Sequence, residues 1–173
     1  MSFSLTPQYS FQELPDISPV FLKRLGIKFL MLDLDNTIAA YGEDFPSDRV
    51  ARWAEEMKVH GIDLYIVSNS GRKGRVEVFS EALGIGAVMA ARKPSRKGLH
   101  RALATAGFST ENSALVGDQV FTDTLAANRA GVVSIIVKPR NCTNPVLALR
   151  YVFEAPFRAA CKKREQGAAD DRI

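Results

Sequence analysis

The chain has 173 residues, of which 46% are hydrophobic and 24% are charged. This length suits one domain, and the composition is that of a folded globular protein, so extensive disorder is not expected. The formal charge of +4 favours anionic partners, and phosphorylated substrates, nucleic acids and anionic lipids all agree with it.

No apolar run approaches the roughly 20 residues that cross a bilayer, and the N-terminus lacks the basic and apolar pattern of a signal peptide. Cys142 and Cys161 are the only cysteines, and their spacing suits neither a metal site nor a redox motif. A reduced compartment is therefore expected, and we expect the protein to be cytoplasmic.

The chain divides into three segments of a single domain. Residues 1–26 contain Pro7, Pro15 and Pro19 and no sustained periodicity, so we expect an N-terminal arm that lies over the domain. Residues 27–140 alternate strand-like apolar runs with amphipathic windows, which is typical of βαβ units and predicts the core. Residues 141–173 predict a C-terminal helix followed by a frayed tail.

The core is predicted to be a doubly wound parallel sheet in an α/β fold with three α/β/α layers. Strands are expected at 28–33, 64–68, 87–90, 114–117 and 133–137. Connecting helices are expected between an N-cap at Ser47 and a stop at Gly61, and at 71–83, 95–106 and 121–130, each of the last three closed by a glycine. Each helix returns the chain through a right-handed crossover.

The C-terminal helix begins after Pro145, and Pro156 is expected to break or kink it. Its apolar face consists of Val146, Leu149, Val152 and Phe153. We expect this face to pack on the sheet or on a second subunit. The alternative is contact with a membrane, where basic residues reach anionic headgroups. Those residues are Arg150, Arg158, Lys162, Lys163 and Arg164.

Asp33 and Asp35 follow the apolar run 27–32, so two carboxylates emerge together at the end of a buried strand. Burial of two like charges is costly unless a cation or phosphate chemistry uses them. Open α/β sheets bind ligands at the carboxyl ends of their strands. The pair therefore predicts a reaction, and a metal-assisted one.

Polar side chains also end the next strands. Ser68 and Asn69 follow the second, Lys93 the third and Asp118 the fourth, with Asp123 shortly after. Because parallel strands end on one side, all these groups should converge on one cleft. Alone, each has a structural explanation, since serine is common in turns, proline favours a helix start, and aspartates cap helices.

The order of these motifs resembles the haloacid dehalogenase (HAD) superfamily of phosphotransferases over roughly residues 27–140. The superfamily's first motif, Asp-x-Asp-x-Thr, matches residues 33–37, and its fourth, Gly-Asp-x-x-x-x-Asp, matches 117–123, with Ser68 and Lys93 in the second and third places. The asparagine in the first motif, the Lys-Pro pair and the sequence 117–123 are similar to the subclass IIIA phosphatases called the YqeG family. That family is similar to the mitochondrial phosphatidylglycerophosphatases.

The resemblance implies a Rossmann-like HAD core and a role for each matching residue. Asp33 would attack phosphorus and become an aspartyl phosphate, and Asp35 would act as general acid and base. Mg²⁺ would be held by Asp33, the backbone carbonyl of Asp35 and Asp118. Ser68 and Lys93 would hold the phosphoryl oxygens.

Looser roles are implied for three more residues. Thr37 and the Asn69 backbone could complete the phosphate cradle, and Asp123 could orient Lys93 or bind Mg²⁺ through water. In this superfamily a cap domain is inserted after the first motif or between the second and third. Only the 30 residues 38–67 and the 24 residues 69–92 separate these motifs here, so we expect a capless, open cleft.

The predicted function is Mg²⁺-dependent hydrolysis of a phosphomonoester, with a substrate that could be lipid-linked or macromolecular. One alternative is a phosphatidylglycerophosphate phosphatase that acts at a membrane surface. A membrane surface is a possible partner but not the favoured one. Another is a non-enzymatic module that binds phosphate or a protein partner on the same fold. Homo-oligomers remain open, and no nucleic acid is predicted. A receiver domain is set aside, because its Lys-Pro pair would stand at the last strand.

Other conspicuous residues have structural explanations. His60 and His100 are isolated on predicted helices and lack ligand spacing, and Trp53 is expected in the core. A basic cluster near the start of the 71–83 helix suits anion recognition as well as a solvated charge run. It consists of Arg72, Lys73 and Arg75.

Overall fold

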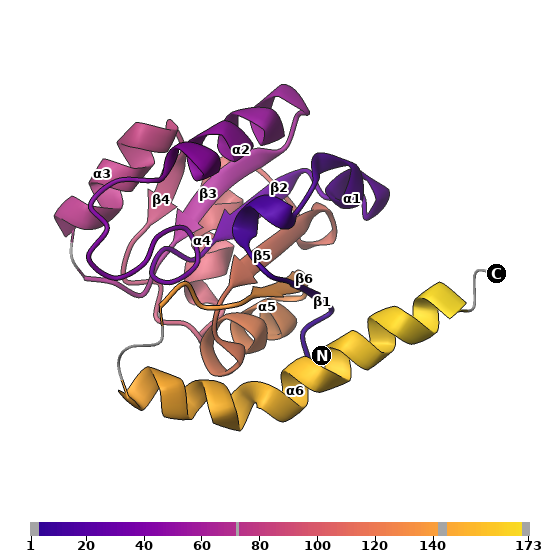
Figure 1. Cartoon of the computed structure of the whole chain (residues 1–173). Helices are drawn as coiled ribbons and strands as arrows, with labels where there is room; N and C mark the ends of the chain where they lie inside the picture. Colours follow the sequence, from indigo (N-terminus) through magenta and orange to yellow (C-terminus); the bar gives the residue numbers. More distant parts are fainter. Residues whose placement is uncertain (1–3, 72, 142–144, 171–173) are drawn as a thin grey trace.

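The computed structural model describes residues 4–71, 73–141 and 145–170, without the side chains of Lys73, Leu147 and 162–170. A six-stranded, all-parallel sheet with the order β1-β6-β5-β2-β3-β4 forms its centre (Figure 1). The predicted doubly wound fold is therefore confirmed. The strands are β1 (Tyr9–Phe11), β2 (Phe29–Leu32), β3 (Asp63–Val67), β4 (Gly86–Val88), β5 (Ser113–Gly117) and β6 (Val133–Val137).

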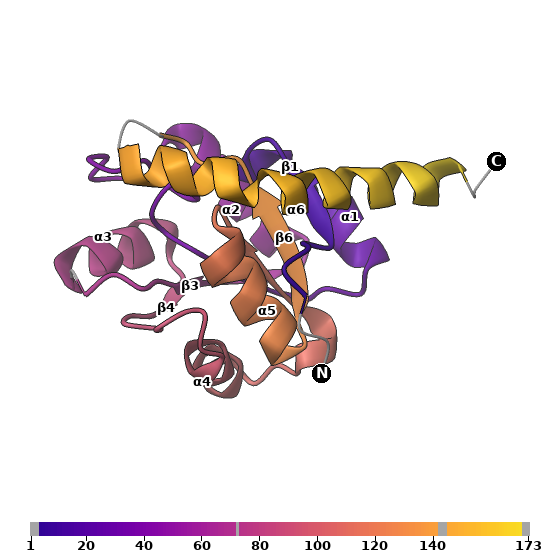
Figure 2. The same ribbon diagram turned by 90° about the horizontal axis from the view of Figure 1, so that it is seen from below.

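Helices cover both faces of the sheet (Figure 2). One face packs against α1 (Pro19–Arg24), α2 (Asp48–Val59) and α3 (Lys73–Leu83), and the other against α4 (Lys97–Ala106) and α5 (Leu125–Ala130). Short turns of 3-10 helix lie at Leu14–Asp16 and Thr110–Asn112, and a π-helical turn at Val120–Thr124 leads into α5.

Side chains of β2 alternate between the two cores, which is why this strand is apolar throughout. Leu30 and Leu32 face α2 and α3, whereas Phe29 and Met31 face α4, and all four are buried. Trp53 is also buried and donates its indole N–H to the carbonyl of Ile17 at 2.8 Å. The core role expected for this tryptophan is confirmed.

Local signals place the helix ends. The hydroxyl of Ser47 accepts a hydrogen bond from the amide of Val50 and caps α2. Gly107 and Gly131 follow α4 and α5 with φ of 75° and 78°, a left-handed conformation that glycine adopts without steric cost. Both glycines were expected to close these helices.

The N-terminal arm differs from the expectation, because it adds β1 to the edge of the sheet. Tyr9 to Phe11 align with Ile135 to Val137 of β6 in parallel register. The strand is only three residues long, and its period of two is too short to recognise between prolines. The predicted five strands are all present, each within about two residues of its expected bounds.

The last helix, α6 (Pro145–Asp170), runs alongside the β1 edge of the sheet (Figures 1 and 2). It continues through Pro156, so the predicted break does not occur, and the alternative of a kink stays a prediction. Helical residues also occupy 162–170, where a frayed tail was expected, while 171–173 lie outside the described residues. Among the described helices, none combines the length and apolar character needed to cross a membrane.

The face of α6 that packs is not the predicted one. The expected apolar face is exposed, with relative exposures from 59% for Leu149 to 73% for Val146. The prediction that this face packs on the sheet is therefore wrong. Glu154, Arg158 and Cys161 are buried instead. The charges of the first two compensate each other, so the helix can bury them. Cys142 and the side chains of Lys162, Lys163 and Arg164 lie outside the described residues.

Candidate active site

Four strands bring polar residues to the carboxyl edge of the sheet. Leu32 aligns with Ile66 on one side and Val116 on the other, so the residues that follow β2, β3 and β5 are neighbours. They surround a small hollow of about 70 Å³, here called the carboxylate hollow. Its lining comprises Asp33, Asp35, Tyr41, Ser68, Asn69, Ser70, Lys93, Gln119, Thr122 and Asp123.

Lys93 is the centre of this cluster. Its ammonium Nζ lies 2.6 Å from Asp33 Oδ1 and 2.7 Å from Asp123 Oδ1, and the residue is buried. Burial alone would lower the pKa of this ammonium, but Asp123 and Asp33 raise it above its ordinary value. Lys93 is therefore a fixed positive charge in the hollow.

The side chain of Asn69, which follows β3, holds the backbone of Lys93. The amide of Asn69 donates to the Lys93 carbonyl at 2.9 Å, and its Oδ1 accepts from the Lys93 amide N–H at 2.7 Å. Only a backbone role was expected for Asn69. Its side chain instead fixes the loop that carries the lysine, and this contact could not be foreseen from the motif alone.

Asp33 is buried under strong opposing influences. Burial raises its pKa to about 7, although the ammonium of Lys93 acts in the opposite direction. The carboxylates of Asp123 and Asp35 add to the upward shift. A further positive charge near Asp33 would favour its ionised form.

Asp118 supplies the reason to expect such a charge. Oxygen atoms of Asp33, Asp118 and Asp123 lie within 4.8 Å of one another. Burial, followed by the charges of Asp123 and Asp33, raises the pKa of Asp118. Within the described part of the chain, Asp118 Oδ1 is buried and has no hydrogen-bond partner. A divalent cation fits this set of hard, crowded oxygen ligands.

Gly117 permits the close approach that brings Asp123 into the cluster. A Cβ atom at this glycine would lie 2.2 Å from Asp123 Cγ, which no other residue could accommodate without movement. Asp123 Oδ2 also accepts from the Gln119 amide at 3.1 Å. The capping role considered for Asp123 and its contact with Lys93 therefore coexist.

Asp35 lies at the open side of the hollow, with its side chain 20% exposed. Its Oδ1 accepts from Arg75 Nε at 3.2 Å. Arg75 is the only member of the predicted basic cluster whose side chain is described, since Arg72 and the Lys73 side chain lie outside the described residues. Arg75 thus contacts a carboxylate that the sequence argument had left free.

Ser68 and Thr37 are both buried near Asp33. Ser68 Oγ lines the hollow and accepts from the Ser70 amide at 3.0 Å, so it also serves the turn. Thr37 does not line the hollow. Its Oγ1 finds no hydrogen-bond partner among the residues that the structure describes, and the expected cradle role stays a prediction.

The C-terminal helix contributes contacts that sequence reasoning missed. Arg158 donates to the backbone carbonyl of Asp118 and, at 3.1 Å, to that of Val137. Glu154 accepts from the Phe121 amide at 3.2 Å and pairs with Arg158 at 3.2 Å. The spacing of four residues could have suggested an ion pair, but not that it would be buried against the loop after β5.

Two histidines stand apart from the site. His60 and His100 are both exposed, and neither lines the carboxylate hollow. His60 Nδ1 lies 2.9 Å from the Glu56 carbonyl, which it contacts at the end of α2. The expectation that neither histidine belongs to the site agrees with these positions.

Known proteins resemble this chain in sequence. A family model described as HAD-hydrolase-like matches residues 90–150. A protein of Bacillus subtilis (strain 168) named "Probable phosphatase YqeG" is 42% identical over 123 residues, which are 71% of this chain and 71% of that protein.

Solved structures with low sequence identity share the fold. The 3-deoxy-D-manno-octulosonate 8-phosphate phosphatase of Moraxella catarrhalis, solved with magnesium, phosphate and KDO, has a TM-score of 0.54 at 16% identity, covering 83% of this chain and 94% of its own. An uncharacterized protein of Listeria monocytogenes serotype 4b has a TM-score of 0.54 at 17% identity, covering 69% and 85%. With the 42% identity above, the chain belongs to the HAD superfamily of hydrolases, in the family of YqeG.

Proposed function

We propose that this phosphatase hydrolyses a phosphomonoester through attack of the Asp33 carboxylate on phosphorus, in a reaction that depends on Mg²⁺. One observation carries the proposal: Lys93 Nζ lies 2.6 Å from Asp33 inside a carboxylate cluster that spans 4.8 Å. A nucleophile, cation ligands and a positive charge for phosphoryl oxygens thus meet in one hollow.

The residues of this cluster suit Mg²⁺. Asp33 and Asp118 offer carboxylate oxygens, and we propose the backbone carbonyl of Asp35 as a third ligand. The unpartnered, buried oxygen of Asp118 among the described residues supports this assignment. When bound, the cation would neutralise charge on the phosphoryl oxygens.

Asp35 is the proposed proton donor and acceptor. In the first step Asp33 forms a bond to phosphorus, the ester P–O bond breaks, and Asp35 protonates the departing alkoxide. In the second step water attacks the aspartyl phosphate, and its proton passes to the Asp35 carboxylate while phosphate leaves. The partly exposed position of Asp35 beside Arg75 supports access for the leaving alcohol and water.

Lys93 and Ser68 are proposed to hold the phosphoryl oxygens. Lys93 balances the charge that a carboxylate nucleophile and a phosphoryl group would bring together. Of the two roles considered for Asp123, orientation of Lys93 is the better supported, because their contact is 2.7 Å. We propose a cytoplasmic location for this reaction.

A direct assay tests the proposal. Hydrolysis of p-nitrophenyl phosphate should need Mg²⁺ and stop when EDTA removes it, with recovery after Mg²⁺ is restored. Turnover that persists in EDTA would exclude the metal assignment. Hydrolysis that is absent with Mg²⁺ for every monoester in a panel of lipid, sugar, nucleotide and aryl phosphates would exclude the phosphatase assignment.

A second candidate function is hydrolysis of a lipid-linked monoester at a membrane surface. The exposed face of α6, formed by Val146, Leu149, Val152 and Phe153, favours it. Sedimentation with anionic liposomes should then show binding that weakens with salt and with Val152→Asp. Because Val152 is 65% exposed, this substitution should leave the melting temperature unchanged. Binding that is absent at low salt would remove this candidate.

A further inference from the structure

A larger hollow adjoins the carboxylate hollow on its open side. Its volume is about 670 Å³, and we call it the rim hollow. The loop after β2 and the start of α3 line it, through Tyr41, Gly42, Asp44, Phe45, Gly74, Arg75 and Val78. Tyr41 lines both hollows, so the two spaces meet at its side chain.

The pair of Asp35 and Arg75 marks the boundary between the two spaces. Asp35 lines the carboxylate hollow and Arg75 the rim hollow, and their side chains are joined at 3.2 Å. A general acid must lie within hydrogen-bond reach of the oxygen that it protonates. If Asp35 protonates the leaving alcohol, that alcohol departs on the side of the rim hollow.

The loop that carries Tyr41 and Phe45 is held in place from two sides. Arg75 donates to the backbone carbonyls of Glu43 and, at 3.0 Å, Ala40. The Glu43 carboxylate accepts from the Ala40 amide at 2.8 Å and from Arg140 at 3.4 Å. These contacts hold the backbone of the loop, and Tyr41 lines the same hollow as Asp35.

The loop presents two aromatic rings to the rim hollow. Phe45 is 68% exposed and Tyr41 50% exposed, although both line a hollow where their rings could be covered. Exposed aromatic rings that line a concavity are typical of binding sites. A bound apolar group would bury area that folding leaves in contact with water.

Among the described side chains, the charges that line the rim hollow are either already paired or negative. The guanidinium of Arg75 already contacts the Asp35 carboxylate and two backbone carbonyls, and it lies 5.0 Å from the Phe79 ring centroid. Asp44 adds a carboxylate to the lining. Among the described side chains, the hollow therefore offers little attraction to a polyanion.

We propose that the rim hollow binds the alcohol part of the substrate, and that this part is uncharged and apolar, either aromatic or alkyl. The inference rests on the proposed function, because it takes its direction from Asp35 as the proton donor. Phe45 and Tyr41 are then specificity-determining residues, which contact the leaving group and not the phosphoryl group.

Three soluble phosphomonoesters, assayed with the full chain, test this inference. With Mg²⁺, kcat/KM should rise from glycerol 3-phosphate to hexyl phosphate and 1-naphthyl phosphate. Phe45→Ser should lower kcat/KM for 1-naphthyl phosphate by about tenfold, mainly through KM, because a ring contact of the leaving group is lost. The same variant should change kcat/KM for glycerol 3-phosphate by less than about twofold. The loss of kcat/KM caused by Phe45→Ser, compared between the hexyl and the naphthyl ester, distinguishes an alkyl from an aromatic preference, because each ester is then its own reference for leaving-group acidity.

Val59→Ser is the matched control, since Val59 is an 82% exposed apolar residue on α2 and lines neither hollow. This substitution should leave kcat/KM unchanged for all three substrates. Fluorescence titration with 1-naphthol provides a readout that needs no turnover, and Phe45→Ser should weaken this binding several-fold. Equal naphthol binding by wild type and Phe45→Ser, or equal loss for all three esters, would overturn the inference. Absence of hydrolysis for all esters would overturn the proposed function instead.

Discussion

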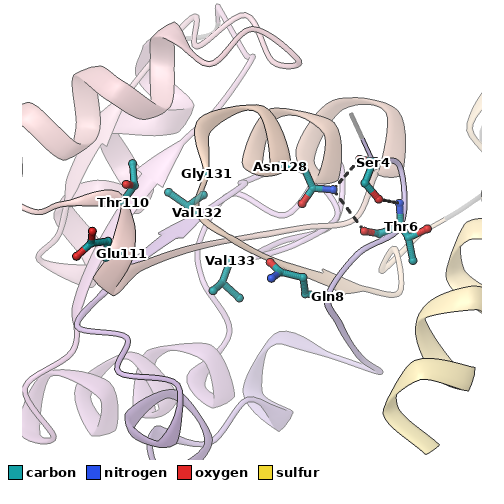
Figure 3. A pocket seen from close by; sticks show the side chains of 9 residues that line it. All are labelled: Ser4, Thr6, Gln8, Thr110, Glu111, Asn128, Gly131, Val132 and Val133. Atoms are coloured by element: carbon teal, nitrogen blue, oxygen red, sulfur yellow. Dashed lines mark hydrogen bonds between the residues drawn. The ribbon is translucent and has the colours of Figure 1, made fainter. Parts of the chain in front are cut away.

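The carboxylate hollow lies at the carboxyl ends of the strands, called the carboxyl edge, and another hollow lies at their amino ends, called the amino edge. The two hollows differ in their chemistry. At the carboxyl edge, Asp33, Lys93 and Asp123 bury charges in a space of about 70 Å³. At the amino edge, a hollow of about 390 Å³ lies between the N-terminal segment and the end of α5 (Figure 3). It is lined by Ser4, Thr6, Gln8, Thr110, Glu111, Asn128, Gly131, Val132 and Val133.

The amino-edge hollow is larger than the carboxylate hollow, but its lining is mostly uncharged. Asn128 donates to the carbonyls of Ser4 at 2.6 Å and Thr6 at 3.3 Å, and these contacts hold the N-terminal segment (Figure 3). Glu111 is the one titratable side chain in its lining. The carboxyl edge instead crowds like charges at a cost that folding alone does not repay. The comparison teaches that charge arrangement, and not size, identifies the active site.

The largest expected effect is at Asp33. Asp33→Asn should reduce kcat by roughly a thousandfold or more, because an amide cannot serve as the nucleophile. Its melting temperature should be unchanged or higher, because a crowded buried charge is removed. Steady-state kinetics and calorimetry measure both. Glu111→Gln, at the other edge, is the control and should retain activity. Comparable activity in the two variants would erase the distinction between the edges.

The next effect concerns α6 and the carboxyl edge. Arg158→Met should lower the free energy of unfolding by about 3 kcal/mol, because Glu154 loses its buried partner. Among the described residues, Glu154 then keeps only the Phe121 amide and the partly exposed Arg150 at 3.7 Å. Adding Glu154→Gln should recover part of this loss. Urea denaturation measures both variants. A loss below about 1 kcal/mol for Arg158→Met would mean that this pair behaves as a surface ion pair.

Metal binding should stabilise the carboxyl edge selectively. Mg²⁺ at 100 times its dissociation constant should add about 2.7 kcal/mol to the free energy of unfolding. This gain should disappear in Asp118→Asn and persist in Glu111→Gln. Thermal denaturation with and without Mg²⁺ provides the measurement. A gain retained in Asp118→Asn would place the cation elsewhere.

The smallest effect is expected at the amino edge. Asn128→Ala removes the two hydrogen bonds to the N-terminal segment and should lower the free energy of unfolding by about 1 kcal/mol. Hydrolysis of p-nitrophenyl phosphate at saturating Mg²⁺ should be unaffected. A loss of activity larger than the loss of folded protein would show that the amino-edge hollow takes part in function.

Much of the fold was predictable because the central strands carry strong signals. β2 is a continuous apolar run and β6 is apolar except for Ser134, and such runs in a parallel sheet are buried on both faces. The convergence of Asp33, Lys93 and Asp118 followed from parallel strands alone. Local pattern and global topology agree in this part of the chain.

The missed features depend on tertiary contacts. β1 has three residues and gains its hydrogen bonds from β6, so it has little pattern of its own. On α6, periodicity identifies residues that share a face but not which face is buried. Glu154 and Arg158 are buried because they satisfy backbone groups around Asp118 and each other, and this compensation appears only after the chain has folded.

The central claim is that Asp33 is the nucleophile, and trapping its phosphorylated form tests it most directly. The full chain is mixed with Mg²⁺ and 1-naphthyl phosphate, quenched, and reduced with borohydride, which converts an aspartyl phosphate to homoserine. Peptide mass spectrometry should find homoserine at position 33, and only when substrate and Mg²⁺ are both present. Homoserine at position 35 or at another aspartate, with position 33 unmodified during active turnover, would contradict the account.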